Sequence, residues 1–276
     1  MQAYLRDLTT KTEAVNPLHI AVLNLMPLKE DTETDLINVL SNSPYEVELD
    51  LMRIASHESK HCSSQHMERF YRDFEDMREE AFDGFIVTGA PLEHLPFEEV
   101  TYWESLCEIF DWARERVKTT LYICWAAQAA LYHFYGIKKY PISEKLFGIF
   151  PHRACAKTHP LLGGLDDVFF VPHSRHTEIH KDDVLRHKEL RLLSESEEAG
   201  VHIIAERDRD NFFITGHSEY SVMTLDREYR RDLGKGLPIH VPENYYPGDN
   251  PDLPPRDSWR SAAVKIYTNW VTEFVV

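Results

Sequence analysis

The stretch that decides the fold is Thr119-Thr-Leu-Tyr-Ile-Cys124-Trp-Ala-Ala-Gln-Ala-Ala-Leu-Tyr-His-Phe-Tyr135. Its first part is a short run of β-branched, aromatic and aliphatic residues, which is typical of a buried strand. Its second part is rich in helix-forming residues, and Gly136 follows as a helix stop. Because no glycine or proline separates the two parts, the sequence predicts a strand-to-helix junction at Cys124.

The same alternation of strands and helices continues on both sides of this junction. Expected strands cover residues 18–25, 45–52, 84–89, 119–124, 167–171, 200–205 and 212–215, and expected helices cover 31–41, 103–117, 125–135, 221–234 and 257–274. This alternation indicates an α/β fold with a doubly wound, mainly parallel sheet flanked by helices. Charged residues alternate with apolar ones over 45–52, which places that strand near a sheet edge.

Length and composition fit one folded domain. The chain has 276 residues, of which 43% are hydrophobic and 12% aromatic, and this excludes disorder and fibrous repeats. We expect a single domain over 1–276, with an N-terminal extension at 1–17 and an ordered, proline-rich surface crossing at 236–256. No apolar run reaches the length of a membrane helix, and residues 1–16 lack the apolar stretch of a secretory signal. We therefore expect a cytoplasmic protein.

Charge and cysteine content narrow the range of partners. Thirty Lys and Arg against 46 Asp and Glu give a net charge of −16, so nucleic acid is not an expected partner. A small anionic ligand is compatible with this charge where basic residues or helix N-termini meet it. The four cysteines form no CxxC pair and no disulfide framework.

Cys124 is the strongest candidate for a catalytic group. In doubly wound sheets, ligands bind beyond the carboxyl ends of the strands, and a helix N-terminus at that place favours a thiolate. Small residues at Ala126 and Ala127 let the chain turn tightly after the cysteine. The alternative is a buried cysteine that ends a core strand, since the glycine-flanked G-x-C-x-G elbow of hydrolases is absent.

A thiol nucleophile needs a base, and the base needs an orienting group. The stretch Phe212-Phe-Ile-Thr-Gly-His217-Ser-Glu219 offers both at the end of a strand. In an extended chain His217 and Glu219 project to the same face, so the carboxylate can orient the imidazole. With fifteen histidines in the chain, an ordinary surface pair is the alternative.

Two histidine-rich segments have the spacing of metal ligands. His57-Glu-Ser-Lys-His61 matches H-E-x-x-H, but its polar neighbours leave no apolar face that could bury such a helix, which favours a solvated loop over a zinc site. His173-Ser-Arg-His176-Thr-Glu-Ile-His180 is expected in a loop after a strand, and Arg175 favours an anion-binding or scaffold role for it. No G-x-G-x-x-G or Walker loop is present. We therefore expect no metal site and no standard nucleotide site.

Five stretches carry a resemblance to a known family. They are Ile20-Ala-Val-Leu-Asn-Leu-Met-Pro-Leu-Lys29, Asp83-Gly-Phe-Ile-Val-Thr-Gly-Ala-Pro91, Ile123-Cys-Trp-Ala-Ala-Gln-Ala129, Pro172-His-Ser-Arg-His-Thr-Glu178 and Gly216-His-Ser-Glu-Tyr220. In this order they resemble the homoserine O-acyltransferases of bacterial methionine synthesis, also called homoserine transsuccinylases. The resemblance runs from about residue 18 to 274 and implies a class I glutamine-amidotransferase-like (flavodoxin-like) fold.

The resemblance also implies a reaction and its residues. It implies ping-pong transfer of an acetyl group from the co-substrate acetyl-CoA to the hydroxyl of L-homoserine, with no permanently bound cofactor. Cys124 would carry the acyl thioester, with His217 as base and Glu219 as its partner, while Lys29, Lys145, Ser174 and Arg231 fall at substrate positions. Glu93 falls at the position where glutamate goes with acetyl-CoA and glycine with succinyl-CoA. The expected partners are small-molecule substrates, with a homodimer as the candidate assembly.

Alternatives stay open at this point. Serine differs from homoserine by one methylene, which is worth only about 1–3 kcal/mol of discrimination, and succinyl-CoA is the alternative donor. A glutamine-amidotransferase-like hydrolase would share the same triad. A noncatalytic small-molecule binder would keep the fold without the chemistry.

Overall fold

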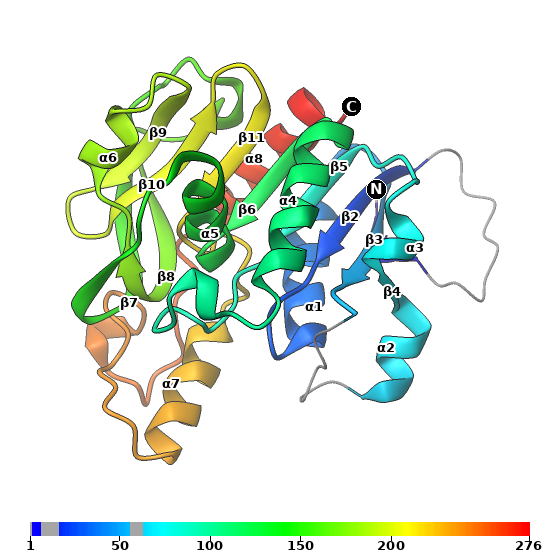
Figure 1. Ribbon diagram of the computed structural model, residues 1–276. Helices are drawn as coiled ribbons and strands as arrows, with labels where there is room; N and C mark the ends of the chain where they lie inside the picture. The colour runs from blue at the N-terminus through cyan, green and yellow to red at the C-terminus, as the bar shows by residue number, and fades with distance from the viewer. Residues whose placement is uncertain (1, 7–16, 56–62) are drawn as a thin grey trace.

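The computed structural model describes residues 2–6, 17–55 and 63–276 (Figure 1). Within these ranges, the strands are β1 (Ala3–Leu5), β2 (Leu18–Leu23), β3 (Val47–Arg53), β4 (Tyr71–Asp73), β5 (Gly84–Val87), β6 (Thr119–Ile123), β7 (Tyr140–Ala154), β8 (Val168–Glu178), β9 (Leu190–Ser196), β10 (Gly200–Glu206) and β11 (Asp210–Ile214). They form one sheet with the order β1-β3-β2-β5-β6-β11-β10-β9-β7-β8, and β4 pairs with β3 beside that order. The strand expected near an edge, β3, lies one place in from β1.

The α-helices of the described residues are α1 (Lys29–Leu40), α2 (Ser64–Phe70), α3 (Phe74–Met77), α4 (Trp103–Arg116), α5 (Trp125–Tyr135), α6 (Lys181–Leu185), α7 (Thr224–Gly234) and α8 (Arg260–Trp270). A π-helical turn, Val271–Val275, continues α8. Short 3₁₀ turns occur at Phe97–Glu99, Pro160–Leu162 and Pro247–Asp249. Among these helices, none combines the length and the apolar character that a membrane span requires.

Helices pack on both faces of the sheet, as β2 illustrates. Ile20 and Val22 belong to a core cluster shared with α1 and α8, whereas Ala21 and Leu23 belong to a second cluster shared with α4 and α5. Successive residues of a strand face opposite sides, so a strand covered on both faces is apolar throughout. Figure 1 shows α4 and α5 in front of the sheet and α1 and α8 behind it. The predicted α/β class is confirmed.

The sheet is mixed. Among the described strands, six pairings are parallel, including the run from β1 to β11, and four are antiparallel, joining β11, β10, β9, β7 and β8. The sequence did not indicate β7 or β9. Antiparallel neighbours need no helix between them, so this half of the sheet lacks the strand–helix alternation that indicated the other half.

One expectation about a loop was wrong. We expected His173–His180 to lie in a loop, but His173–Glu178 forms the second half of β8. Pro172 and the polar residues after it suggested the end of a strand. The pairing with β7 nevertheless continues through Ile149 opposite Pro172 to Leu146 opposite Arg175. Six of the eleven residues of β8 are buried, and the polar His173, Arg175 and Thr177 are among them.

The two segments expected outside the regular fold both contact it. Within 1–17, β1 adds an edge strand parallel to β3. Within 236–256, Tyr245 and Tyr246 are buried, and the main chain of Glu243 pairs with Gly148 of β7. A Cβ at Gly148 would come within 2.5 Å of the Glu243 backbone, so only glycine permits this approach.

Candidate active site

Cys124 occupies a strained turn between β6 and α5. Its backbone has φ 53° and ψ −114°, a conformation that residues with a side chain rarely adopt. The surrounding structure holds it there: Cys124 N–H donates to the carbonyl of Ile214 (2.7 Å), and Gln128 N–H donates to the carbonyl of Cys124 (3.2 Å). The cysteine is 4% exposed and stands at the N-terminus of α5. Strain of this kind is concentrated at functional sites.

His217 and Glu219 meet Cys124 because their strands are neighbours. β11 runs parallel to β6 with Ile214 opposite Ile123, so the segments that follow the two strands leave the sheet at the same edge. Nδ1 of His217 lies 2.6 Å from Oε1 of Glu219, and His217 hydrogen-bonds the thiol of Cys124. Because Nδ1 faces the carboxylate, Nε2 is the nitrogen that serves the cysteine.

The charges around His217 favour its protonated form. Burial alone would lower the pKa of His217, but the Cys124 thiolate and the Glu219 carboxylate together raise it well above its ordinary value. The imidazole is therefore protonated at neutral pH while the thiolate is present. A thiolate beside an imidazolium is the reactive form of a cysteine nucleophile.

A second carboxyl group lies behind Glu219. Asp35 of α1 accepts hydrogen bonds from the backbone N–H of Ser221 (3.2 Å) and from the hydroxyl of Thr224 (3.3 Å). Burial and the charge of Glu219 raise the pKa of Asp35 to about 7. The hydroxyl of Tyr267, from α8, donates to the free oxygen of Glu219 at 3.4 Å. α8 thus contacts the triad directly, and α1 holds the segment that follows Glu219.

A cavity of about 350 Å³ opens onto the triad. Cys124 and His217 line it, and so do four further residues singled out from the sequence: Glu93, Lys145, Ser174 and Arg231. They come from the loop after β5, from β7, from β8 and from α7. The structure therefore brings these side chains together around Cys124. Burial raises the pKa of Glu93.

Lys29 is placed differently. It is the first residue of α1 and is 4% exposed, and it does not line the cavity. Its ammonium donates to the carbonyl oxygens of Asn24 (2.6 Å) and Met26 (3.5 Å), in the segment between β2 and α1. Met26 itself lines the cavity, so Lys29 holds part of the wall rather than facing the interior.

Glu228 is a cavity residue that the sequence analysis missed. It accepts hydrogen bonds from the ammonium of Lys145 (2.6 Å) and the hydroxyl of Ser174 (2.8 Å), and the guanidinium of Arg231 lies 3.7 Å away. Arg231 is itself paired through two nitrogens with Asp232. Glu228 stands three residues before Arg231 on α7, and this spacing puts both on one helix face. This spacing from Arg231 was the sequence signal that could have identified Glu228.

Comparison with known proteins identifies the family. The model of a family described as homoserine O-succinyltransferase matches residues 3–276. The chain belongs to this family. Its relatives include proteins named homoserine O-acetyltransferase, from Bacteroides thetaiotaomicron (58% identical, over 95% of this chain and 86% of the relative), Parabacteroides distasonis (54%, over 98% and 87%) and Geobacillus kaustophilus (50%, over 96% and 87%).

Solved structures place this homoserine O-succinyltransferase family member within a wider fold. A glutamine amidotransferase from Thermotoga maritima matches 94% of this chain and 98% of its own, with a TM-score of 0.58 and 10% identity. One from Methylobacillus flagellatus matches 95% and 96%, with a TM-score of 0.57 and 11% identity. At such low identity the likeness concerns the fold alone, and it confirms the expected glutamine-amidotransferase-like architecture.

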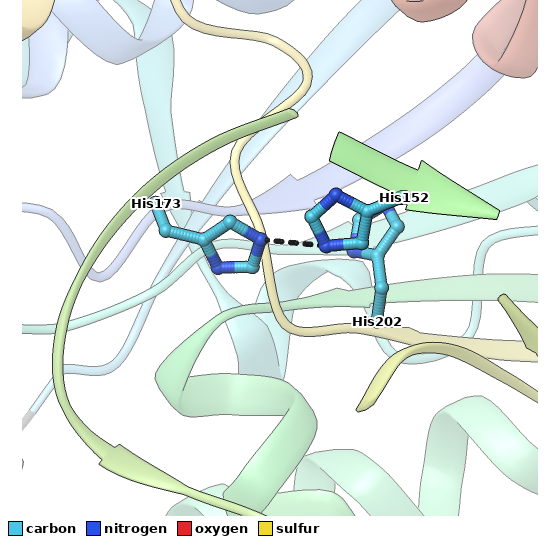
Figure 2. Close-up of side chains that lie close together, drawn as sticks. All are labelled: His152, His173 and His202. Carbon is cyan, nitrogen blue, oxygen red and sulfur yellow. Dashed lines mark hydrogen bonds between the residues drawn. The ribbon is translucent and has the colours of Figure 1, made fainter. Parts of the chain in front are cut away.

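The histidine segments of this family member fall in different places. His57–His61 lies outside the described residues. His176 lines the cavity, whereas His180 stacks on Tyr140 away from it. His173 joins two histidines that the analysis did not single out, His152 of β7 and His202 of β10, in a buried cluster (Figure 2). Among the described residues, these three histidines form the group that could offer three ligand atoms to one metal ion, because their ligand atoms all lie within 4.8 Å of one another.

The hydrogen bonds of this histidine cluster give it a neutral, scaffolding character. Nε of the buried Arg175 donates to Nδ1 of His173 (3.4 Å), so neutral His173 carries its proton on Nε2 and donates to Nε2 of His152 (3.1 Å). His152 then donates from Nδ1 to the carbonyl of Phe150 (2.9 Å). The guanidinium beside this chain disfavours a divalent cation there.

The cluster supports the segment that carries His217. A Cβ at Gly216 would come within 2.9 Å of Nε2 of His173, so the imidazole packs directly against this glycine. The next residue, His217, donates its backbone N–H to the carbonyl of Pro172 (2.8 Å). We infer that β8 and the histidine cluster fix the position of the His217 backbone.

Proposed function

We propose that the protein transfers an acetyl group from acetyl-CoA to the hydroxyl of L-homoserine through a thioester on Cys124. The observation that carries this proposal is the buried Cys124–His217–Glu219 triad at a cavity, in a chain with relatives at 50–58% identity that are named homoserine O-acetyltransferase. No permanently bound cofactor takes part. Acetyl-CoA is the co-substrate.

In the first half-reaction, the Cys124 thiolate attacks the carbonyl carbon of acetyl-CoA. A new carbon–sulfur bond forms to Cys124, and the bond to the coenzyme sulfur breaks. The His217 imidazolium gives its proton to the departing coenzyme thiolate. Free coenzyme A leaves, and the enzyme keeps the acetyl thioester with a neutral His217.

Thioester formation also prepares the base for the second half-reaction. The negative charge of the Cys124 thiolate is the leading cause that raises the pKa of His217, and acylation removes it. His217 therefore stays neutral and accepts the proton of the homoserine hydroxyl as that oxygen attacks the thioester. O-acetylhomoserine departs, and the thiolate–imidazolium pair is restored.

The charged wall of the cavity suits an amino-acid acceptor. Arg231 and Lys145 offer positive charge for the α-carboxylate, and Glu228 offers negative charge for the α-ammonium. In the free protein these groups neutralise one another, and Asp232 holds Arg231. A zwitterion would replace these internal pairs with pairs of its own, whereas an uncharged alcohol would leave them intact.

Intact-protein mass spectrometry tests the thioester. With acetyl-CoA alone, we expect one acetyl group on Cys124, which homoserine then removes as O-acetylhomoserine. Cys124→Ala should lose the adduct and more than about a thousandfold of activity while keeping its melting temperature. Cys107→Ala is the control, because Cys107 lies on α4 and burial raises its pKa to about 12. Full activity in Cys124→Ala would refute the mechanism.

A substrate panel separates the alternatives. Homoserine, serine and threonine are each combined with acetyl-CoA and with succinyl-CoA, and the product is measured for every pair. We expect the highest kcat/KM for homoserine with acetyl-CoA. A preference for serine would reassign the acceptor, and ammonia release from glutamine would favour a hydrolase of the amidotransferase kind.

A further inference from the structure

Lys139 holds the loop that carries Glu93, although it does not line the cavity. Its ammonium donates to the carbonyl oxygens of Leu95 (2.6 Å), Glu93 (2.8 Å) and Leu92 (3.4 Å). A lysine ammonium has three N–H donors, so these contacts use all of them. The same ammonium lies 4.5 Å from the ring centre of Phe97, just beyond the loop.

These contacts join the Glu93 loop to the helix that begins at the nucleophile. α5 starts directly after Cys124 and ends at Tyr135, with Gly136 in the left-handed conformation as its cap, and Lys139 follows three residues later. The loop's own main-chain bonds, from Leu92 to Ala90 and from Leu95 to Leu92, both stay within it. Lys139 therefore supplies a tie between this loop and the segment that joins α5 to β7.

We propose that Lys139 is a positioning residue for the choice of acyl donor. By fixing the main chain of residues 92–95, it holds the Glu93 carboxylate at the cavity, where a succinyl chain would have to lie. This inference rests on the role that the family resemblance implies for Glu93, which is to favour acetyl-CoA over succinyl-CoA. Discrimination of this kind depends on where the carboxylate stands, since both the steric and the electrostatic repulsion fall off with distance.

The test replaces the ammonium without changing the length of the side chain greatly. Lys139→Met is compared with Lys138→Met, because Lys138 is the exposed neighbour on the same segment. We measure kcat/KM for acetyl-CoA and succinyl-CoA, and KM for homoserine. Lys139→Met should lower the acetyl-to-succinyl ratio at least fivefold and leave KM for homoserine unchanged, and Lys138→Met should leave all three unchanged. A purely structural defect would instead reduce kcat/KM for both donors by the same factor. That result would overturn the proposal.

A double-mutant cycle shows whether Lys139 acts through Glu93. In a Glu93→Gly background, Lys139→Met should change the donor ratio by less than twofold. An equal effect in both backgrounds would mean that Lys139 acts by another route, and the inference would fall. If Glu93→Gly alone leaves the ratio unchanged, the role of Glu93 falls, and this inference falls with it.

A second variant guards against a folding defect. If Lys139→Met does not fold, Lys139→Gln takes its place, because its amide keeps two N–H donors near the same carbonyls. The donor ratio should then fall in the same direction by a smaller factor. An unchanged ratio in a folded Lys139→Gln, with Glu93→Gly altering it, would overturn the role of Lys139 and spare that of Glu93.

Discussion

His217 and Glu219 stand two residues apart, and the 2.6 Å contact between Nδ1 and Oε1 lies entirely inside the protein. A carboxylate at that distance, shielded from water, interacts strongly with the imidazolium form of the ring. The thiolate of Cys124 acts on the same ring from the opposite side. The protonation state of His217 therefore depends on two anions, of which only Glu219 keeps its charge throughout the proposed cycle.

Removing the permanent anion should shift the pH dependence. Glu219→Gln takes away one of the causes that raise the pKa of His217, so that pKa falls and the imidazolium is lost at a lower pH. We expect the alkaline limb of thiol alkylation by iodoacetamide to move to lower pH and kcat to fall by about two to four orders of magnitude. Glu115→Gln, at an exposed position of α4, should change neither. An unshifted profile would contradict this role of Glu219.

Donor choice should depend on Glu93. A succinyl group would bring two methylenes and a carboxylate into the space beside Glu93, with a like-charge repulsion on the order of 1–4 kcal/mol. Glu93→Gly should therefore raise the use of succinyl-CoA relative to acetyl-CoA at least about tenfold, which corresponds to roughly 1.4 kcal/mol. The ratio of kcat/KM values measures it. Equal use of both donors by the unmodified protein would show that this position does not set the preference.

Asp35 should make stability depend on pH. The pKa of Asp35 is about 7 in the folded protein and exceeds that of an unfolded aspartate. The contribution of Asp35 to the free energy of unfolding is therefore present at low pH and is lost as the pH rises to about 7. Asp35→Asn keeps an acceptor for Ser221 but cannot ionise. The free energy of unfolding of Asp35→Asn, measured relative to that of the unmodified protein, should rise by at least about 1 kcal/mol from pH 5 to pH 8. Urea unfolding at both pH values measures this change, with the exposed Asp166→Asn as the control that should show none.

Gly216 should tolerate no side chain. In Gly216→Ala the new Cβ would meet Cγ1 of Val171 at 2.6 Å and Nε2 of His173 at 2.9 Å, and the backbone next to His217 would have to shift. We expect a loss of about 1–3 kcal/mol in stability together with a loss of activity. Gly234→Ala is the matched control, because no atom lies within 4 Å of its new Cβ, and it should be neutral or slightly stabilising. Similar melting temperatures for the two variants would argue against tight packing at Gly216.

The sequence predicted those site residues whose place in the fold follows from the local pattern of strands and helices. Cys124 and His217 each follow a buried strand, and neighbouring parallel strands end at one edge, so their meeting could be predicted from pattern alone. Glu228 was missed because its role comes from α7 packing across the cavity from β7 and β8. The cluster of His152, His173 and His202 was missed because it joins three strands of the antiparallel half, whose pairing no local pattern indicates.

The backbone of Cys124 has a further consequence for engineering. A residue held at φ 53° and ψ −114° costs the fold on the order of 1–3 kcal/mol, which glycine would not incur. Cys124→Gly should therefore be inactive and yet melt at a higher temperature than the unmodified protein. Directed evolution that rewards heat resistance alone would favour this catalytically dead variant, and thermostable versions of the enzyme have to be selected for turnover at the same time.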